Sequence, residues 1–188
     1  VINSCMIKEG GEENKKPSME AGFHALLGKY VIHTHSVYAN IIGCARDGER
    51  LLETIFQDKG IGIMWLPYDN PWLFLALGMN KAIKRYEARH GNAPEAILIQ
   101  NHGMVVAGDD CERVSNVHTV IQKIIKDYFG LYELFPEIKI FETEKGDFES
   151  KTSYIIDFMK EQGALSDNFS ETVLFPDQIV FCENIGLS

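Results

Sequence analysis

Two short apolar runs, residues 96–100 and 104–107, are separated only by Asn101-His102-Gly103. Asparagine and glycine are residues that tight turns favour, so this pattern predicts a β-hairpin. A hairpin pairs its two strands antiparallel, and a sheet that contains one cannot be purely parallel. Strand-like and helix-like segments alternate along the rest of the chain. We therefore expect an α/β fold in which helices flank a central mixed, largely antiparallel sheet.

The apolar periodicity predicts where the other elements lie. Expected strands cover residues 29–35, 60–66, 138–141 and 178–181. Expected helices cover residues 18–28, a segment from 36, 51–56, 72–90, 109–132 and 153–161. Ser18 is the predicted N-cap of the first helix. On the second helix, the predicted inward face consists of Val37, Ile41, Ile42 and Cys44.

Length and charge limit the class of protein. A chain of 188 residues is large enough for one buried core, so we expect a single domain over residues 1–188. The net charge of −9, without a Lys/Arg run longer than two residues, argues against nucleic acid and anionic membrane surfaces as partners. The four cysteines are scattered without a CxxC pair, which favours reduced thiols and a cytoplasmic location.

Histidines gather where these strands are expected to end. His33 and His35 close an apolar strand and, because side chains alternate along a strand, they point to the same face. His102 lies in the turn of the hairpin. Three histidines with an open position are typical of a catalytic zinc site, and Glu20 heads the helix before the histidine strand. The alternative is structural: imidazoles that hydrogen-bond at a sheet end and cap a turn, with Glu20 in solvent.

The chain resembles the class II aldolase/adducin-like family, which includes fuculose-phosphate and rhamnulose-phosphate aldolases. The resemblance covers roughly residues 17–182 and implies a three-layer α/β sandwich. The segments that carry it are Pro17-Ser18-Met19-Glu20, Phe23-His24, Val31-Ile32-His33-Thr34-His35-Ser36, Leu66-Pro67-Tyr68, Ile99-Gln100-Asn101-His102-Gly103 and Leu174-Phe175-Pro176-Asp177.

The resemblance also implies a reaction. A zinc ion, or another divalent metal, would be held by His33, His35, His102 and Glu20, one per subunit. The substrate would be a ketose phosphate, cleaved at a carbon–carbon bond. Glu20 would move protons, and Ser18 would contact the substrate phosphate. Such aldolases release dihydroxyacetone phosphate and an aldehyde. Family analogy further implies a homotetramer with active sites between subunits.

Other activities stay open within the family. Its ribulose-phosphate 4-epimerases carry Asp where this chain has Glu20, whereas its methylthioribulose-phosphate dehydratases share the Glu. A non-catalytic adducin-like module and a metal-binding protein without turnover are further alternatives.

The sequence departs from the aldolases at two places. Met19 stands where the aldolases have a second phosphate-binding serine, and the chain begins at Val1 without the loops that complete the phosphate site. We therefore expect either an N-terminally truncated fragment or a shortened form with a different grip on its substrate. His24 is interpreted as a neighbour of the site or a core histidine, and His90, His118 and Tyr68 as structural residues.

Overall fold

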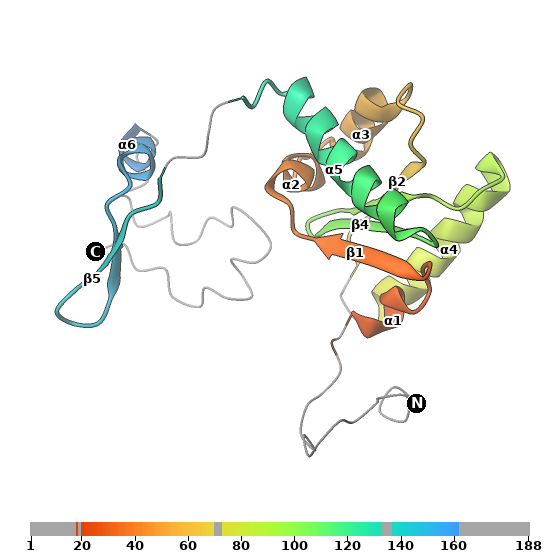
Figure 1. The fold of residues 1–188 in the computed structure, drawn as a ribbon, viewed down its shortest axis with the longest axis horizontal. Coiled ribbons are helices and arrows are strands. Elements are labelled where there is room, and N and C mark those ends of the chain that lie inside the picture. The colour runs from red at the N-terminus through yellow and green to blue at the C-terminus, as the bar shows by residue number, and fades with distance from the viewer. Residues whose placement is uncertain (1–17, 19, 70–72, 133–136, 162–188) are drawn as a thin grey trace, which may run out of the picture. The chain divides into compact units, whose positions relative to one another are not determined.

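The structure is a computed structural model that describes residues 18, 20–69, 73–132 and 137–161 (Figure 1). The chain divides into two compact units, Val1–Phe129 and Gly130–Ser188, which are described separately. The single domain over residues 1–188 stays a prediction, and the strand expected at residues 178–181 lies outside the described residues. Within the described part of the chain, no helix is long and apolar enough to span a membrane.

A four-stranded mixed sheet forms the centre of the first unit. Its strands are β1 (Tyr30–Thr34), β2 (Ile63–Leu66), β3 (Ala96–Ile99) and β4 (Gly103–Gly108), in the order β1-β4-β3-β2. Strand β4 pairs antiparallel with both β1 and β3, and β2 pairs parallel with β3. The predicted hairpin is therefore confirmed as β3 and β4, and the sheet is mixed and largely antiparallel as expected.

Helices cover both faces of this sheet, which confirms the three-layer α/β sandwich (Figure 1). The helices α2 (Val37–Gly43), α3 (Gly48–Phe56) and α5 (Cys111–Tyr128) pack on one face. The helices α1 (Ala21–His24) and α4 (Leu73–His90) pack on the other.

Strand β3 shows why a sheet with two covered faces forms. All four of its residues are buried: Ala96 and Leu98 join the core beneath α2, α3 and α5, and Ile97 and Ile99 join the core beneath α1 and α4. A continuous apolar run is what a strand needs when both of its faces are covered.

Three helix predictions need correction. The helix expected over residues 18–28 is regular only over Ala21–His24, because Leu26 and Leu27 donate their N–H groups to carbonyls three residues earlier, as in a 3₁₀ turn. Helix α5 ends at Tyr128 and not at 132, since Gly130 adopts a positive φ of 65° that stops the helix.

The inward face of α2 was also predicted wrongly. Its buried positions are Ala39, Ile42 and Gly43, whereas Val37 is 60% exposed and Cys44 is exposed. Among the predicted residues only Ile42 reaches the core, because the buried positions follow the spacing i, i+3, i+4 from Ala39.

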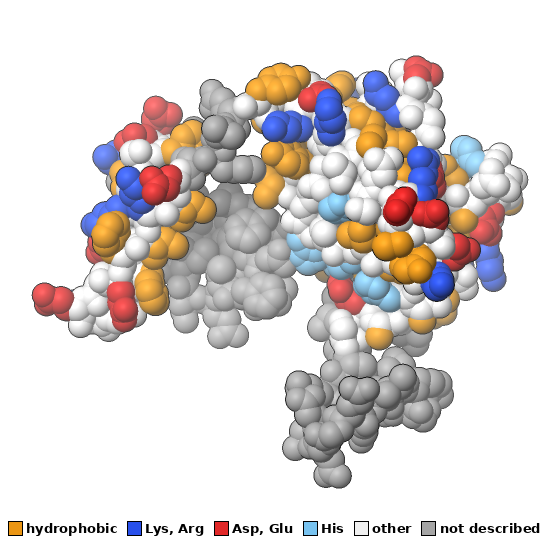
Figure 2. All heavy atoms as spheres, in the orientation of Figure 1, with side chains coloured by type: hydrophobic (Ala, Val, Ile, Leu, Met, Phe, Trp, Pro, Cys, Tyr) orange, Lys and Arg blue, Asp and Glu red, His pale blue; other side chains and the backbone are white. Residues whose placement is uncertain are grey.

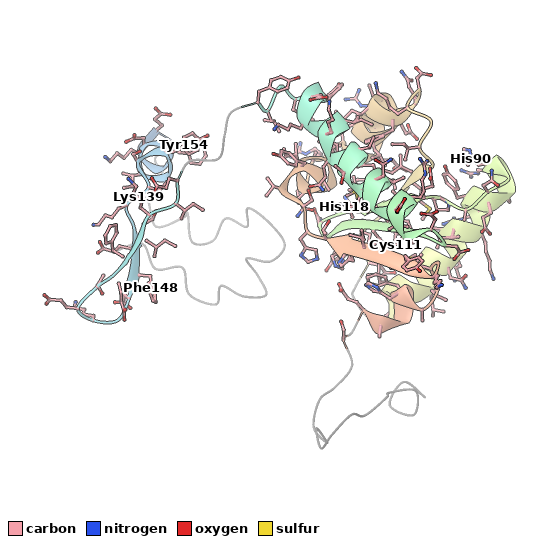
Figure 3. All side chains as sticks on the ribbon, viewed as in Figure 1. His90, Cys111, His118, Lys139, Phe148 and Tyr154 are labelled. Carbon is pink, nitrogen blue, oxygen red and sulfur yellow. The ribbon has the colours of Figure 1, made fainter. Side chains whose placement is uncertain are left out.

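The second unit contains a hairpin and a helix among its described residues. Strands β5 (Ile140–Glu142) and β6 (Phe148–Ser150) pair antiparallel, and α6 (Ser153–Glu161) follows at the bounds expected from the sequence. Strand β6 was not predicted. The buried Thr152 accepts a hydrogen bond on Oγ1 from the N–H of Lys139, labelled in Figure 3, and so ties the two ends of the hairpin together.

A matched pair of truncations tests this core. Leu98 is fully buried in the sheet, and Leu77 is 47% exposed on α4. We expect Leu98→Ala to lower the free energy of unfolding by about 3 kcal/mol, because a cavity replaces buried contacts, and Leu77→Ala to lower it by less than about 1 kcal/mol. Urea unfolding of both variants measures the difference, and equal losses would contradict the described packing.

Candidate metal centre

The pairing of β1 with β4 places the histidine strand beside the hairpin turn. In this register His33 lies opposite Val105 and Thr34 lies opposite Met104, the second residue of β4. The side chain of Val31 packs with the core beneath α1 and α4, and His33, two residues on, has the same facing. His33 and His35 therefore emerge at the α1 side of the sheet, next to the turn that carries His102.

Backbone hydrogen bonds fix the hairpin turn itself. Asn101 adopts a left-handed conformation with φ of 52°, which asparagine tolerates better than most residues. The N–H of Asn101 donates to the carbonyl of Gly43 at the end of α2, and the N–H of His102 donates to the carbonyl of Ile99. These bonds hold the backbone that carries the third imidazole.

Gly103 is required by the close approach of β1. A Cβ atom at this position would lie 2.6 Å from the carbonyl oxygen of Thr34 and 2.8 Å from Cδ2 of His35. Real Cβ contacts essentially never come this close, so any side chain would displace either the strand or the imidazole. The glycine after His102 thus allows two of the histidines to come together.

Glu20 reaches the histidines from the start of α1. Its backbone N–H donates to Oγ of the exposed Ser18 over 3.2 Å. Its carboxylate Oε1 lies 2.9 Å from Nε2 of His102 and 3.4 Å from Nε2 of His33, with the side chain 25% exposed. The carboxylate therefore sits among the imidazoles and keeps access to solvent.

The four residues form one compact group. The ring centroids of His33, His35 and His102 are 5.0 to 5.1 Å apart in each pair, with the ring planes 80° to 86° from one another. With Glu20, they offer four ligand atoms that all lie within 4.8 Å of one another. In Figure 2 several histidine side chains gather on one face of the first unit with an acidic side chain among them. The structure thus brings together all four residues singled out in the sequence.

His33 is a buried imidazole whose ring nitrogens lack hydrogen bonds among the described residues. Its side chain is only 10% exposed, and among the described residues neither of its buried ring nitrogens has a hydrogen-bond partner. Burial is the main cause that lowers the pKa of His33 to about 4, against the raising effect of Glu20 and with further lowering by the neighbouring histidines. At neutral pH this imidazole is neutral, with a lone pair available on a ring nitrogen.

A metal ion fits this donor set. Neutral imidazoles and a carboxylate are the nitrogen and oxygen ligands that zinc takes in proteins, and a tetrahedral zinc ion holds its ligands about 3.4 Å apart. The separations here, up to 4.8 Å, reach that geometry by a contraction of at most about 1.4 Å. A cation would also bind a buried ring nitrogen of His33, which has no hydrogen-bond partner among the described residues.

Two further histidines lie around the centre: His24, which was foreseen as a neighbour, and His118, which was not. His24, one turn after Glu20, stacks on Phe23 and lies edge-on to His33, with ring centroids 4.7 and 5.9 Å apart. His24 therefore belongs to the packing around the site. His118 was interpreted as a structural residue on its helix, and its Nε2 lies 3.0 Å from Oγ1 of Thr34, the residue between His33 and His35. The available signal was a polar pair, His118 and Gln122, four residues apart beside the apolar stripe of α5.

Two other residues, His90 and Tyr68, were expected to be structural. His90 stacks on Tyr86 at the end of α4, with ring centroids 4.2 Å apart. Tyr68 is exposed, and its backbone N–H donates to Oε1 of Gln100.

The first unit matches, over residues 2–129, the family described as the Class II Aldolase and Adducin N-terminal domain. This chain belongs to that family. The match covers the whole sheet and every residue of the metal centre.

Two curated proteins are similar to the chain. The match to an uncharacterized oxidoreductase, YuxG, of Bacillus subtilis (strain 168) is 29% identical over 139 residues, 71% of this chain and 19% of that protein. The match to a methylthioribulose-1-phosphate dehydratase of Microcystis aeruginosa (strain NIES-843 / IAM M-2473) is 27% identical over 145 residues, 69% of each chain.

Solved structures resemble it more distantly. The N-terminal class II aldolase domain of a conserved protein from Thermoplasma acidophilum superposes with a TM-score of 0.47 and 23% identity, covering 60% of this chain and 48% of that one. An L-fuculose 1-phosphate aldolase superposes with a TM-score of 0.44 and 18% identity, covering 79% of this chain and 64% of that one.

Metal titration tests the centre directly. We expect the chelator-treated chain to bind one zinc ion and His102→Ala to lose at least about tenfold in affinity, because a ligand and its contact with the Glu20 carboxylate disappear together. His90→Ala removes an imidazole outside the centre and serves as the matched control. Calorimetry and metal analysis of the dialysed proteins provide the measurement, and unchanged binding by His102→Ala would contradict the assignment.

The lowered pKa of His33 predicts a pH dependence of stability in the metal-free protein. The unfolded chain takes up a proton at this imidazole near pH 6.5, whereas the folded chain does so only near pH 4. The free energy of unfolding is therefore unaffected by His33 above pH 6.5. It falls as the pH drops from 6.5 toward 4, by about 3 kcal/mol in total. Urea unfolding in the presence of a chelator should show this loss in the parent and a shallower slope in His33→Gln. An equal pH dependence of the free energy of unfolding in the parent and in His33→Gln would contradict this prediction.

Proposed function

We propose that this chain is a metal-dependent lyase that cleaves a carbon–carbon bond in a ketose phosphate of the rhamnulose- or fuculose-1-phosphate type. The observation that carries the proposal is the placing of a partly exposed carboxylate against three imidazoles, one of them neutral and buried. Membership of the aldolase family supports the reaction class.

The chemistry of the substrate explains what the site must do. Cleavage breaks the bond between the carbon next to the carbonyl group and the following carbon, which bears a hydroxyl. The electrons of this bond stay on the carbon next to the carbonyl, and the ketone oxygen becomes negatively charged. A divalent ion bound by His33, His35 and His102 would supply a Lewis acid that stabilises such charge. Neutral histidines suit this role because they add no negative charge of their own to the site.

Glu20 is the proton-transfer residue in this proposal. Its carboxyl group is held by His102 and reaches solvent, so in its protonated form it can give a proton to the carbon released by cleavage. The proton of the hydroxyl that becomes the aldehyde passes to solvent, and Glu20 is reprotonated from solvent. Ser18 is exposed and accepts a hydrogen bond on Oγ from the N–H of Glu20, and it is the proposed contact for the substrate phosphate. Assembly as a homotetramer stays part of the proposal, by analogy with the family.

Dehydration is the second candidate reaction, because a methylthioribulose-1-phosphate dehydratase is matched over 69% of its length. Both reactions pass through negative charge on the oxygens of a ketose phosphate, and they differ in the bond broken at the next carbon. Cleavage breaks a carbon–carbon bond and releases dihydroxyacetone phosphate. Dehydration breaks a carbon–oxygen bond and leaves the carbon chain whole.

Product analysis tests the proposal and separates the two reactions. The zinc-loaded chain is incubated with rhamnulose, fuculose and methylthioribulose 1-phosphates, and the expected product from a ketose 1-phosphate is dihydroxyacetone phosphate. We expect Glu20→Gln to lower kcat/KM by about 100-fold or more, because the amide cannot exchange a proton. Glu53→Gln changes an exposed glutamate on α3 and should leave the rate unchanged.

Two outcomes would overturn the assignment. Full activity of Glu20→Gln would remove the carboxylate from the mechanism. A product that keeps all its carbon atoms and has lost water would replace cleavage by dehydration.

A further inference from the structure

A chain of side-chain hydrogen bonds joins helix α5 to the histidine strand. Oγ1 of Thr34 lies 3.0 Å from Nε2 of His118, and Nδ1 of His118 lies 3.1 Å from Nε2 of Gln122. The hydroxyl of Ser36 donates to Oε1 of Gln122 over 2.8 Å. Figure 3 labels His118 on α5, the helix that packs against β1. The four residues Thr34, Ser36, His118 and Gln122 are called the α5 clamp below.

The donors and acceptors of the clamp define one arrangement. Because the Gln122 amide oxygen accepts from Ser36, its NH₂ group donates to Nδ1 of His118. Nδ1 is then unprotonated, and the proton of a neutral His118 lies on Nε2, which donates to Thr34. Burial lowers the pKa of His118 and so favours this neutral form. Every step has one donor and one acceptor.

The clamp grips the two residues that alternate with the proposed ligands. Thr34 separates His33 from His35, and Ser36 follows His35 directly. Since side chains alternate along an extended segment, the imidazoles emerge on the α1 side while the hydroxyls face α5. Fixing the hydroxyls therefore fixes the backbone rotation that aims both imidazoles.

The clamp does not serve to attach the helix, because α5 has an apolar contact for that purpose. Val114, Val117, Ile121 and Ile125 are buried against the sheet. Partly buried amide and imidazole groups add no stability over apolar ones unless they are paired, and here they pair with each other and with the hydroxyls of Thr34 and Ser36.

We propose that His118 and Gln122 are positioning residues of the metal centre: through Thr34 and Ser36 they hold His33 and His35 in the orientation that binds the metal. This inference rests on the proposed function in one respect, that the four-residue group binds a metal. It assigns a role to two residues of α5 that reach the centre through Thr34 and Ser36 and that the reaction itself does not need.

The test compares zinc affinity among variants of the intact chain. Gln122→Leu and His118→Leu remove the clamp and keep side chains of similar size, and we expect each to weaken zinc binding by about tenfold or more. Gln122→Glu keeps the clamp in another form. Its carboxylate accepts from Ser36 and pairs with a protonated His118, which still donates to Thr34. Its zinc affinity should stay within about threefold of the parent. Thr119→Ala, on the exposed face of α5, is the matched control.

Nitrogen NMR of His118 provides a readout that loss of stability alone would not give. The parent should show one protonated ring nitrogen, Nε2, and Gln122→Glu should show two. Urea unfolding identifies any variant that is not folded, and Gln122→Glu then decides the question.

Each outcome has one meaning. If the parent and Thr119→Ala bind zinc, Gln122→Leu binds weakly and Gln122→Glu binds well, the clamp positions the ligands. If folded Gln122→Leu and His118→Leu bind as tightly as the parent, the clamp inference is wrong while the metal centre stands. A parent chain that binds no zinc would overturn both.

Discussion

The antiparallel register between β1 and β4 is the constraint on which the site depends. It sets the end of the histidine strand beside the turn that carries His102, with Thr34 opposite Met104. A slip by one residue would turn His33 and His35 to the α5 face and send Thr34 toward Glu20. The apolar residues of β1 prevent this slip, because Ile32 packs beneath α5 and Val31 beneath α4. Core packing thus determines the orientation of the ligands.

Burying the polar imidazoles of the site costs free energy wherever their ring nitrogens are not paired. Three imidazoles lie about 5 Å apart in a partly buried space, and among the described residues the buried ring nitrogens of His33 have no hydrogen-bond partner. The fold stabilises this arrangement from outside the site, through a sheet with both faces covered and through the close contact that Gly103 allows. A metal ion would bind a ring nitrogen of His33 and so offset the cost of burying it without a hydrogen bond. Metal binding thus gives a reason for the cluster that packing alone does not give.

The sequence predicts the ligands better than it predicts their supports. The period-two spacing of His33 and His35 and the turn at His102 are local patterns, and the structure brings those residues together with Glu20. The face of α2 was misjudged because seven residues with several apolar choices do not define one phase, and burial at Ala39 is decided by the neighbouring helices. The contact of His118 with Thr34 spans 84 positions of sequence. No periodicity within either segment predicts such a contact.

Helix α5 acts as a brace for a strand that has a paired neighbour on only one side in the described sheet. The segment leading into the helix holds the start of β1, where the N–H of Lys29 donates to Oδ1 of Asp109 over 3.0 Å. The middle of the helix holds the other end of β1 through the clamp. Asp110 caps the helix by accepting from the N–H of Arg113, so the brace itself begins at a fixed point. An edge strand fixed at both ends can present two ligands in a constant direction, because neither end is free to twist away from the sheet.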